Sequence, residues 1–251
     1  PSRRQNSRAL TFASKLWNAA PVVVAICLIV TISAVTWTKS IRYLEAGFNA
    51  GEGMEKIRDA EFQNALVYVG RAIELAPDVS AYHTLQAAVF LGYLRQDDGL
   101  RAPGCAGLHG AGPYESCLLR QIHIANREGA EQRPLDWRNQ RNLAASAMSL
   151  ARIEGDSDLV EESIRVYRQV AQLDPQTSSH WESLAAGLIQ TRRSEEALES
   201  LDRSLSILDG TPRSAQSRLL EGMAYLQLNR PEAALRTFNE AIRLNPGLAT
   251  A

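Results

Sequence analysis

Residues 215–248 read AQSRLLEGMAYLQLNRPEAALRTFNEAIRLNPGL, and this stretch decides the fold. Small, aromatic and proline residues recur in it at Gly222, Tyr225, Ala234, Phe238, Ala241 and Pro246. Small residues let two helices approach closely, a large ring fills the gap left where the helices cross, and proline ends the second helix. Each class of residue in the stretch therefore has a packing reason.

This spacing resembles the tetratricopeptide repeat, a pair of antiparallel helices that stacks on its neighbours to form a solenoid. A second copy spans 178–211 and carries Trp181, Leu184, Ala185, Leu188, Ala197 and Leu201. A third copy, 137–177, is seven residues longer, and we place the extra residues in the turn at 154–158. The resemblance implies an all-α fold and a surface that binds other proteins.

Two weaker copies precede these three. Ala65, Val69, Ala72 and Pro77 repeat the spacing of the second helix, after a glycine-rich first helix. Residues 80–136 begin like a repeat with Ala87 and Phe90, and we expect a loop insertion at 95–116 before a second helix at 117–133. The repeat domain is therefore expected to cover 39–251 as four or five helix pairs, more than the three that a solenoid needs.

A membrane anchor is predicted before the repeats. Residues 16–38 contain no charged side chain, and this apolar segment is long enough to cross a bilayer as one helix. Trp17 and Trp37 bracket this segment, about 30 Å apart along a helix, and are expected at the two membrane interfaces. A cleaved signal peptide is the main alternative, but the apolar run is too long and Ile32-Ser33-Ala34 is a poor cleavage site.

The basic residues near this segment predict its orientation. Residues 1–15 carry Arg3, Arg4, Arg8 and Lys15, whereas only Lys39 and Arg42 follow the apolar segment closely. Because basic residues favour the cytoplasmic side, we expect the N-terminus in the cytoplasm and the repeat domain outside it, in the periplasm or the extracellular space.

Cys105 and Cys117 flank a glycine-containing loop, and a disulfide between them is the natural interpretation outside the cytoplasm. Unpaired cysteines, or a zinc site formed with His109 and His123, are alternatives. For His83 and His180 we expect surface or capping positions. The sequence shows no phosphate loop and no G-x-S-x-G or H-E-x-x-H motif, so we expect no enzymatic activity, cofactor or metal. The 27 basic and 28 acidic residues nearly cancel, which argues against nucleic-acid binding.

In the family that this chain resembles, ligands lie in a groove lined by the first helix of each pair. Carried over, the expected groove residues are Arg138, Arg141, Ala145, Met148, Glu182, Ala186, Ile189, Leu219, Met223 and Leu226. This set is mostly apolar with a basic end and lacks the family's Lys and Asn clamp for carboxylates. It predicts an amphipathic helix or apolar segment of a protein partner as ligand. Alternatively, Met148, Met223 and Leu226 simply pack inside the superhelix.

These features favour a membrane-anchored scaffold that binds or assembles membrane-associated proteins. A first alternative is the C-terminal tail of a polytopic bacterial glycan ligase or polymerase, since a last transmembrane helix followed by such repeats is similar to O-antigen ligase-like proteins. The initial Pro1 and the lack of a capping helix after Pro246 agree with that alternative. A second alternative is a permanent accessory subunit of a large membrane complex, packed through Thr31, Ser33, Thr36 and Thr38.

Overall fold

The chain folds into ten α-helices and one short 3₁₀ helix within the residues that the computed structural model describes, namely 2–96, 102–108, 111–208 and 211–247. Side chains are described from Val24 onward in these ranges, Ala111 excepted. The helices are α1 (Ser2–Arg58), α2 (Phe62–Leu75), α3 (Ser80–Arg95), α4 (Ala111–Gln132), α5 (Trp137–Glu154), α6 (Ser157–Leu173), α7 (Ser178–Gln190), α8 (Ser194–Leu208), η1 (Pro212–Ser214), α9 (Ala215–Gln227) and α10 (Pro231–Leu244).

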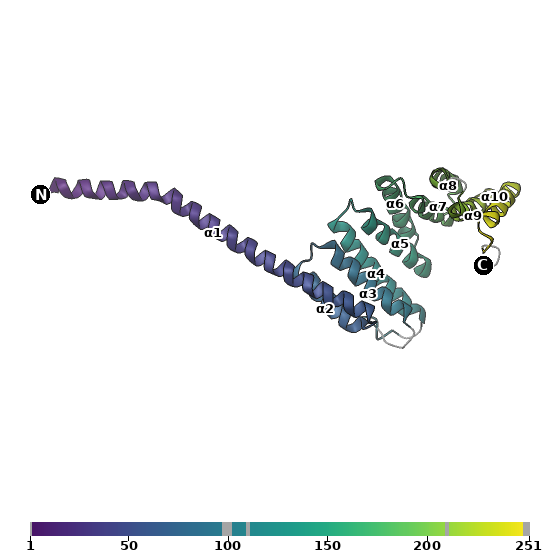
Figure 1. Ribbon diagram of the computed structural model, residues 1–251, viewed down its shortest axis with the longest axis horizontal. Coiled ribbons are helices and arrows are strands. Elements are labelled where there is room, and N and C mark those ends of the chain that lie inside the picture. Colours follow the sequence, from purple (N-terminus) through teal and green to yellow (C-terminus); the bar gives the residue numbers. More distant parts are fainter. Residues whose placement is uncertain (1, 97–101, 109–110, 209–210, 248–251) are drawn as a thin grey trace.

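Consecutive helices pack as antiparallel pairs, and the pairs stack in chain order (Figure 1). The C-terminal part of α1 pairs with α2, and the remaining pairs are α3 with α4, α5 with α6, α7 with α8, and α9 with α10. Each pair also contacts the next along the chain. The structure confirms the predicted helical solenoid and the upper estimate of five pairs.

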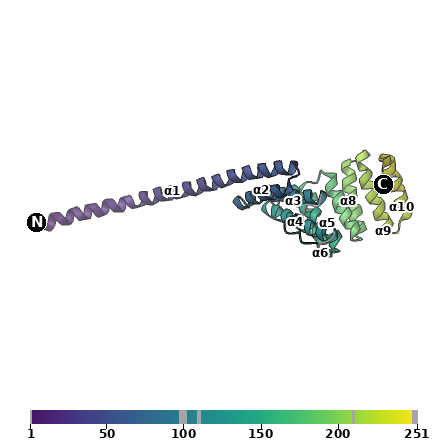
Figure 2. The ribbon, with the colours of Figure 1, turned by 90° about the horizontal axis from the view of Figure 1, so that it is seen from below.

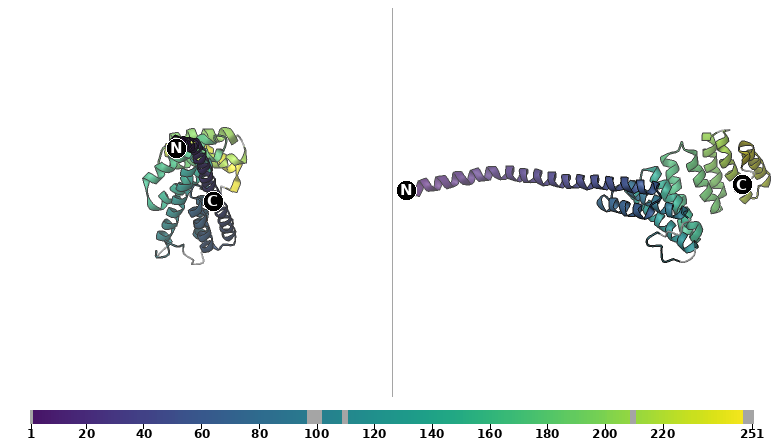
Figure 3. Two further views of the ribbon diagram at one scale, coloured as in Figure 1. Left: turned by 90° about the vertical axis from the view of Figure 1, so that its left-hand side faces the viewer. Right: turned by 60° about the horizontal axis from the view of Figure 1, so that its bottom comes forward.

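Helix α1 is a single helix of 57 residues that belongs both to the apolar segment and to the first pair. It passes the expected boundary between 16–38 and 39–251 without a break, so the apolar segment and the first repeat share one continuous helix. Figures 2 and 3 show its N-terminal half projecting away from the stacked pairs.

Close helix approach explains the small residues of the repeat pattern. A Cβ atom built on Gly222 of α9 would lie 2.3 Å from a ring carbon of Phe238 on α10. A Cβ atom on Gly53 of α1 would lie 2.7 Å from Val69 on α2. At both positions a larger side chain would force the two helices of the pair apart, so glycine is required by packing.

The third repeat is long because its helices are long, which corrects the expectation of an extended turn at 154–158. Helices α5 and α6 contain 18 and 17 residues, against 13 and 15 for α7 and α8. Only Gly155 and Asp156 separate them, with Gly155 at a φ of +68° ending α5. The Asp156 carboxylate then accepts hydrogen bonds from the amides of Asp158 and Leu159 and caps α6.

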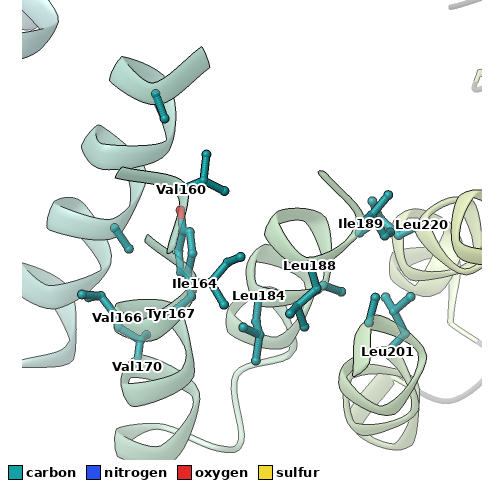
Figure 4. Close-up of a cluster of buried hydrophobic side chains, with 14 of the residues drawn as sticks. Val160, Ile164, Val166, Tyr167, Val170, Leu184, Leu188, Ile189, Leu201 and Leu220 are labelled. Carbon is teal, nitrogen blue, oxygen red and sulfur yellow. The ribbon is translucent and has the colours of Figure 1, made fainter. Parts of the chain in front are cut away.

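The largest apolar cluster joins α5 to α9 and makes three pairs into one body. Both helices of the two pairs α5–α6 and α7–α8 contribute side chains, and the third pair contributes through α9 alone. The cluster includes Val160, Ile164, Val166, Tyr167, Val170, Leu184, Leu188, Ile189, Leu201 and Leu220 (Figure 4). A second cluster joins α2 to α5 and includes Val69, Phe90, Leu118 and Ile122. Leu159 on α6 packs against both clusters and so connects them.

Candidate protein-binding groove

A groove opens between α3 and α5, with α4 as its floor, and encloses about 350 Å³. Every residue that lines it is uncharged. The lining consists of Thr84, Ala87, Ala88, Leu91, Leu119, Ile122, Asn126, Asn142, Ala145, Ser146 and Ser149. Alanines make it wide, three larger aliphatic side chains make it apolar, and the amide and hydroxyl groups offer a few hydrogen bonds.

Buried polar contacts hold the three helices of this groove at a fixed spacing. The Thr84 hydroxyl on α3 donates to the side-chain oxygen of Asn139 on α5, at 3.3 Å. The Asn126 amide on α4 donates to the carbonyl of Asn142 on α5, also at 3.3 Å. A Cβ atom on Gly129 would lie 3.3 Å from the Ser80 carbonyl, so α3 and α4 are in close contact here. The groove is therefore preformed by the packing of its walls.

A disulfide between Cys105 and Cys117 closes the connection between α3 and α4, with the two Cα atoms 6.0 Å apart. Cys105 is fully buried in the core cluster, and the amide of Ala102 donates to the Tyr114 hydroxyl at 3.0 Å. Helix α4 begins at Ala111, so 111–116, expected as loop, are helical. The bonded sulfurs are not available as zinc ligands, and His109 lies outside the described residues.

His123 lies directly beneath the groove and is buried between α4 and α5. Its Nε2 accepts from the Arg127 guanidinium at 2.8 Å, and its Nδ1 lies 3.3 Å from the Ser146 hydroxyl. Burial lowers the pKa of His123 below the ordinary 6.5, the Arg127 charge lowers it further, and Glu162 opposes both. The imidazole is therefore neutral at physiological pH and acts as a polar link in the floor.

The expectation that His83 and His180 lie at surface or capping positions is wrong. His83 is buried, with Nε2 2.9 Å from the Pro77 carbonyl and Nδ1 3.1 Å from the Glu128 carboxylate. His180 is fully buried and packs on the Trp137 ring, with centroids 4.8 Å apart. Both histidines lie in the first turn of the first helix of a pair, a position that the sequence pattern alone does not mark as buried.

The structure places only part of the expected groove residues on an open surface. Ala145 lines the groove between α3 and α5. Arg138 and Arg141 are exposed, and their guanidinium carbons lie 4.7 and 5.4 Å from the centre of the Trp137 ring. This cation–π stacking holds two positive charges at the start of α5. Ala186, Met223 and Leu226 are exposed as well, and Leu219 is half-buried.

Three of the expected groove residues serve packing instead. Ile189 is buried in the core beside Leu220, so its assignment to the groove is corrected (Figure 4). The terminal methyl of Met148 lies 3.1 Å from where a Cβ on Gly187 would be, which agrees with the packing alternative for Met148. Glu182 accepts a hydrogen bond from the Ser217 hydroxyl at 2.5 Å and thereby joins α7 to α9.

Sequence reasoning missed the contribution of α3 and α4 to the groove. The expected set began at Arg138 on α5, because the copy at 80–136 is interrupted by an insertion after its first helix. Thr84, Ala87, Ala88 and Leu91 nevertheless recur at intervals of three, one and three residues on one face of α3. That spacing was a usable signal for a first helix that faces a groove.

A second hollow lies over α6, α7 and α8, encloses about 500 Å³, and differs from the groove by being charged. Trp181 and Leu188 are among its apolar lining, while Arg168 and Arg193 bind the Glu196 carboxylate at 3.0 and 2.7 Å. The Arg193 contact lowers the pKa of Glu196. Because Arg168, Arg193 and Glu196 already pair with one another, these three charges are less available to a ligand.

Helix α1 carries the predicted membrane segment and is the one described helix that is long and apolar enough to cross a membrane. From Val24 to Trp37 its large apolar side chains are exposed. The Trp37 indole is exposed at the expected interface, and the Trp17 side chain lies outside the described ones. Among the described residues, no group of three or more His, Cys, Asp and Glu side chains could hold a metal ion.

Residues 176–246 match the sequence profile of the tetratricopeptide repeat family. No curated protein matches the chain. The crystal structure of MamA protein superimposes with a TM-score of 0.62 and 12% identity, covering 82% of this chain and 94% of that one. MamA from Desulfovibrio magneticus RS-1 superimposes with a TM-score of 0.61 and 10% identity, covering 81% of this chain and 96% of that one. YrrB is described as a TPR protein with an unusual peptide-binding site. It superimposes with a TM-score of 0.60 and 13% identity, covering 79% of this chain and 85% of that one. These likenesses show the fold.

Proposed function

We propose that this chain, a solenoid of the tetratricopeptide-repeat fold, is a non-catalytic scaffold that α1 tethers to a membrane and that binds a segment of another protein in the groove between α3 and α5. The observation that carries the proposal is the presence of two features in one folded chain. An uncharged, preformed groove lies in the repeats, and an exposed apolar helix runs continuously into the first repeat.

The groove lining defines the chemistry of the ligand. With no charged residue in it, the groove offers no oppositely charged partner for the carboxylates of an acidic peptide tail or for phosphates. The aliphatic side chains of Leu91, Leu119 and Ile122 favour the apolar face of an amphipathic helix or an apolar extended segment. The shared fold with YrrB, whose own description includes a peptide-binding site, supports a peptide as ligand.

Two observations support a tether with the repeats outside the cytoplasm. The basic residues before the apolar segment outnumber those close after it, which favours a cytoplasmic N-terminus. The disulfide between Cys105 and Cys117 is typical of an oxidising compartment. A tether also raises the effective concentration of partners in the same membrane, so a groove of this modest size suffices for binding.

Membrane fractionation of the full chain tests the tether. We expect the protein to stay in the membrane pellet after alkaline extraction. Val30→Lys places a charge near the middle of the apolar segment, at a cost of about 3 kcal/mol for insertion, and should release a large part of the protein. Val67→Lys adds the same charge at an equally exposed valine on α2 and should leave the protein in the pellet.

Release of the unmodified chain, or equal behaviour of the two lysine variants, would contradict the tether.

The intact mass of the native protein separates the scaffold from its two alternatives. A much larger chain that contains this sequence would favour the tail of a polytopic glycan ligase. Stoichiometric subunits that resist removal by detergent would favour a permanent subunit of a membrane complex.

A further inference from the structure

The surface of α1 where the apolar segment continues into the first repeat carries an exposed apolar stripe. We define the α1 stripe as Trp37, Ile41, Leu44 and Phe48, whose side chains are 70%, 48%, 63% and 69% exposed. Between Thr38 and Gly53, the other large apolar side chain of α1 is Tyr43, which hydrogen-bonds Asp78. Large apolar side chains gathered on one face of a water-exposed helix indicate an interaction surface.

The stripe follows heptad spacing, with intervals of four, three and four residues. This is the a and d pattern of a left-handed coiled coil. The same spacing, continued towards the N-terminus, reaches Ala34, Val30 and Cys27, so the pattern from Cys27 to Phe48 extends over three heptads. Three to four heptads are typical of a stable coiled coil.

The opposite face of the same helix holds the chain's own repeats. Ala46, Ala50 and Gly53 of α1 are buried inside the first pair, and Gly53 contacts Val69 on α2. In the heptad these residues occupy positions c and f, which point away from a and d. Figure 2 shows α2 and α3 along one side of α1 and no other described element along the other. The stripe therefore stays open after the chain has folded.

We propose that two copies of this chain dimerise in parallel along the α1 stripe. Copies inserted in one membrane with one orientation run parallel, so each presents the stripe to the other in register. The flanking e and g positions agree with self-pairing, since Glu45 and Glu52 would face Ser40 and Gly47 of the second copy and no like charges would meet. This dimer requires no occupant in the groove and holds whether or not the groove binds a partner.

Cysteine crosslinking of the full chain in detergent tests the dimer and its register. In a chain with Cys27→Ser, single cysteines replace Ile41, Leu44 or Phe48 on the stripe, or Arg42 and Asn49 beside it. We expect covalent homodimers to form several times faster from the three stripe positions. The native Cys27, the one free cysteine among the described residues, should also crosslink because it falls on the same spacing.

A matched pair of variants provides the second arm. Leu44→Glu combined with Phe48→Glu should convert a dimeric mass in detergent to a monomeric mass, because charges would meet at two core layers. Val67→Glu, at an α2 valine that is 69% exposed like Phe48, should leave the dimer intact. A monomeric mass for the unmodified chain, crosslinking that is equal at all positions, or stripe cysteines that join only a foreign protein would each overturn the proposal.

Discussion

At the residue scale, the missing side chain of Gly222 allows α9 and α10 to pack closely. Because Phe238 occupies the space of a Cβ atom there, Gly222→Val should push α9 and α10 apart at a cost of about 1–3 kcal/mol. Hydrogen exchange of the α9 and α10 amides measures this loss locally, which suits a solenoid whose pairs can open separately.

Gly70 provides the control for that substitution. It lies inside α2, and no atom would lie within 4 Å of an added Cβ. Gly70→Ala should therefore stabilise α2 by about 0.5–1 kcal/mol through reduced backbone freedom. Unchanged or increased protection of α10 in the Gly222→Val chain would show that the close approach is not required.

His123 makes the pairing of α4 with α5 sensitive to acid. Its pKa in the folded chain lies below the unfolded value of 6.5, so the folded state favours the neutral ring. The stability that depends on this ring is complete above the unfolded pKa and is lost as the pH falls below it. Protonation of Nε2 would also remove the bond from Arg127. The melting temperature should therefore decrease between about pH 7 and pH 5.

His123→Gln removes the titrating group and retains a polar side chain in the same space. Its melting temperature should fall less over the same pH interval, while carboxylates and the other histidines contribute equally in both chains. Equal acid sensitivity of the two chains would assign the effect to other groups, such as His180, whose pKa burial also lowers.

At the scale of elements, the disulfide should stabilise the start of α4 more than the rest of the solenoid. Cys105 and Cys117 are separated by 12 residues, and closing a loop of that size contributes about 3 kcal/mol in the chain-entropy view. Reduction, or Cys105→Ser with Cys117→Ser, should increase hydrogen exchange at 102–108 and in the first turns of α4. Cys27→Ser should change neither, and uniform loosening of all five pairs would contradict a local role.

The sequence predicts best those helices whose packing requires particular residue types at particular positions. Gly222 and Phe238 mark α9 and α10 because a missing side chain and a ring must occur together. The lengths of α5 and α6 escaped prediction, since the acidic and glycine residues at 154–158 suit both a long turn and two adjacent caps. The groove wall on α3 and the burial of His180 depend on the neighbouring pair, which a single repeat does not encode.

At the scale of the whole molecule, tether and groove should be separable. Ala145→Phe fills the groove from an exposed position and should leave the fold and the membrane fractionation unchanged, while binding of a partner is lost. Fractionation and circular dichroism of this variant check the first part, and recovery of the partner with the chain checks the second. Loss of membrane association in Ala145→Phe would show that the two parts are coupled.

The most direct test of a groove that holds another protein beside a membrane is photocrosslinking from Leu91 in intact membranes. A photoreactive amino acid at Leu91 should form an adduct with one apolar segment of a membrane-associated protein, mapped by mass spectrometry, and Ala145→Phe should abolish it. The same probe at exposed Leu235 on α10 should be insensitive to Ala145→Phe. No adduct from Leu91, or an adduct that persists when the groove is filled, would contradict the proposed function.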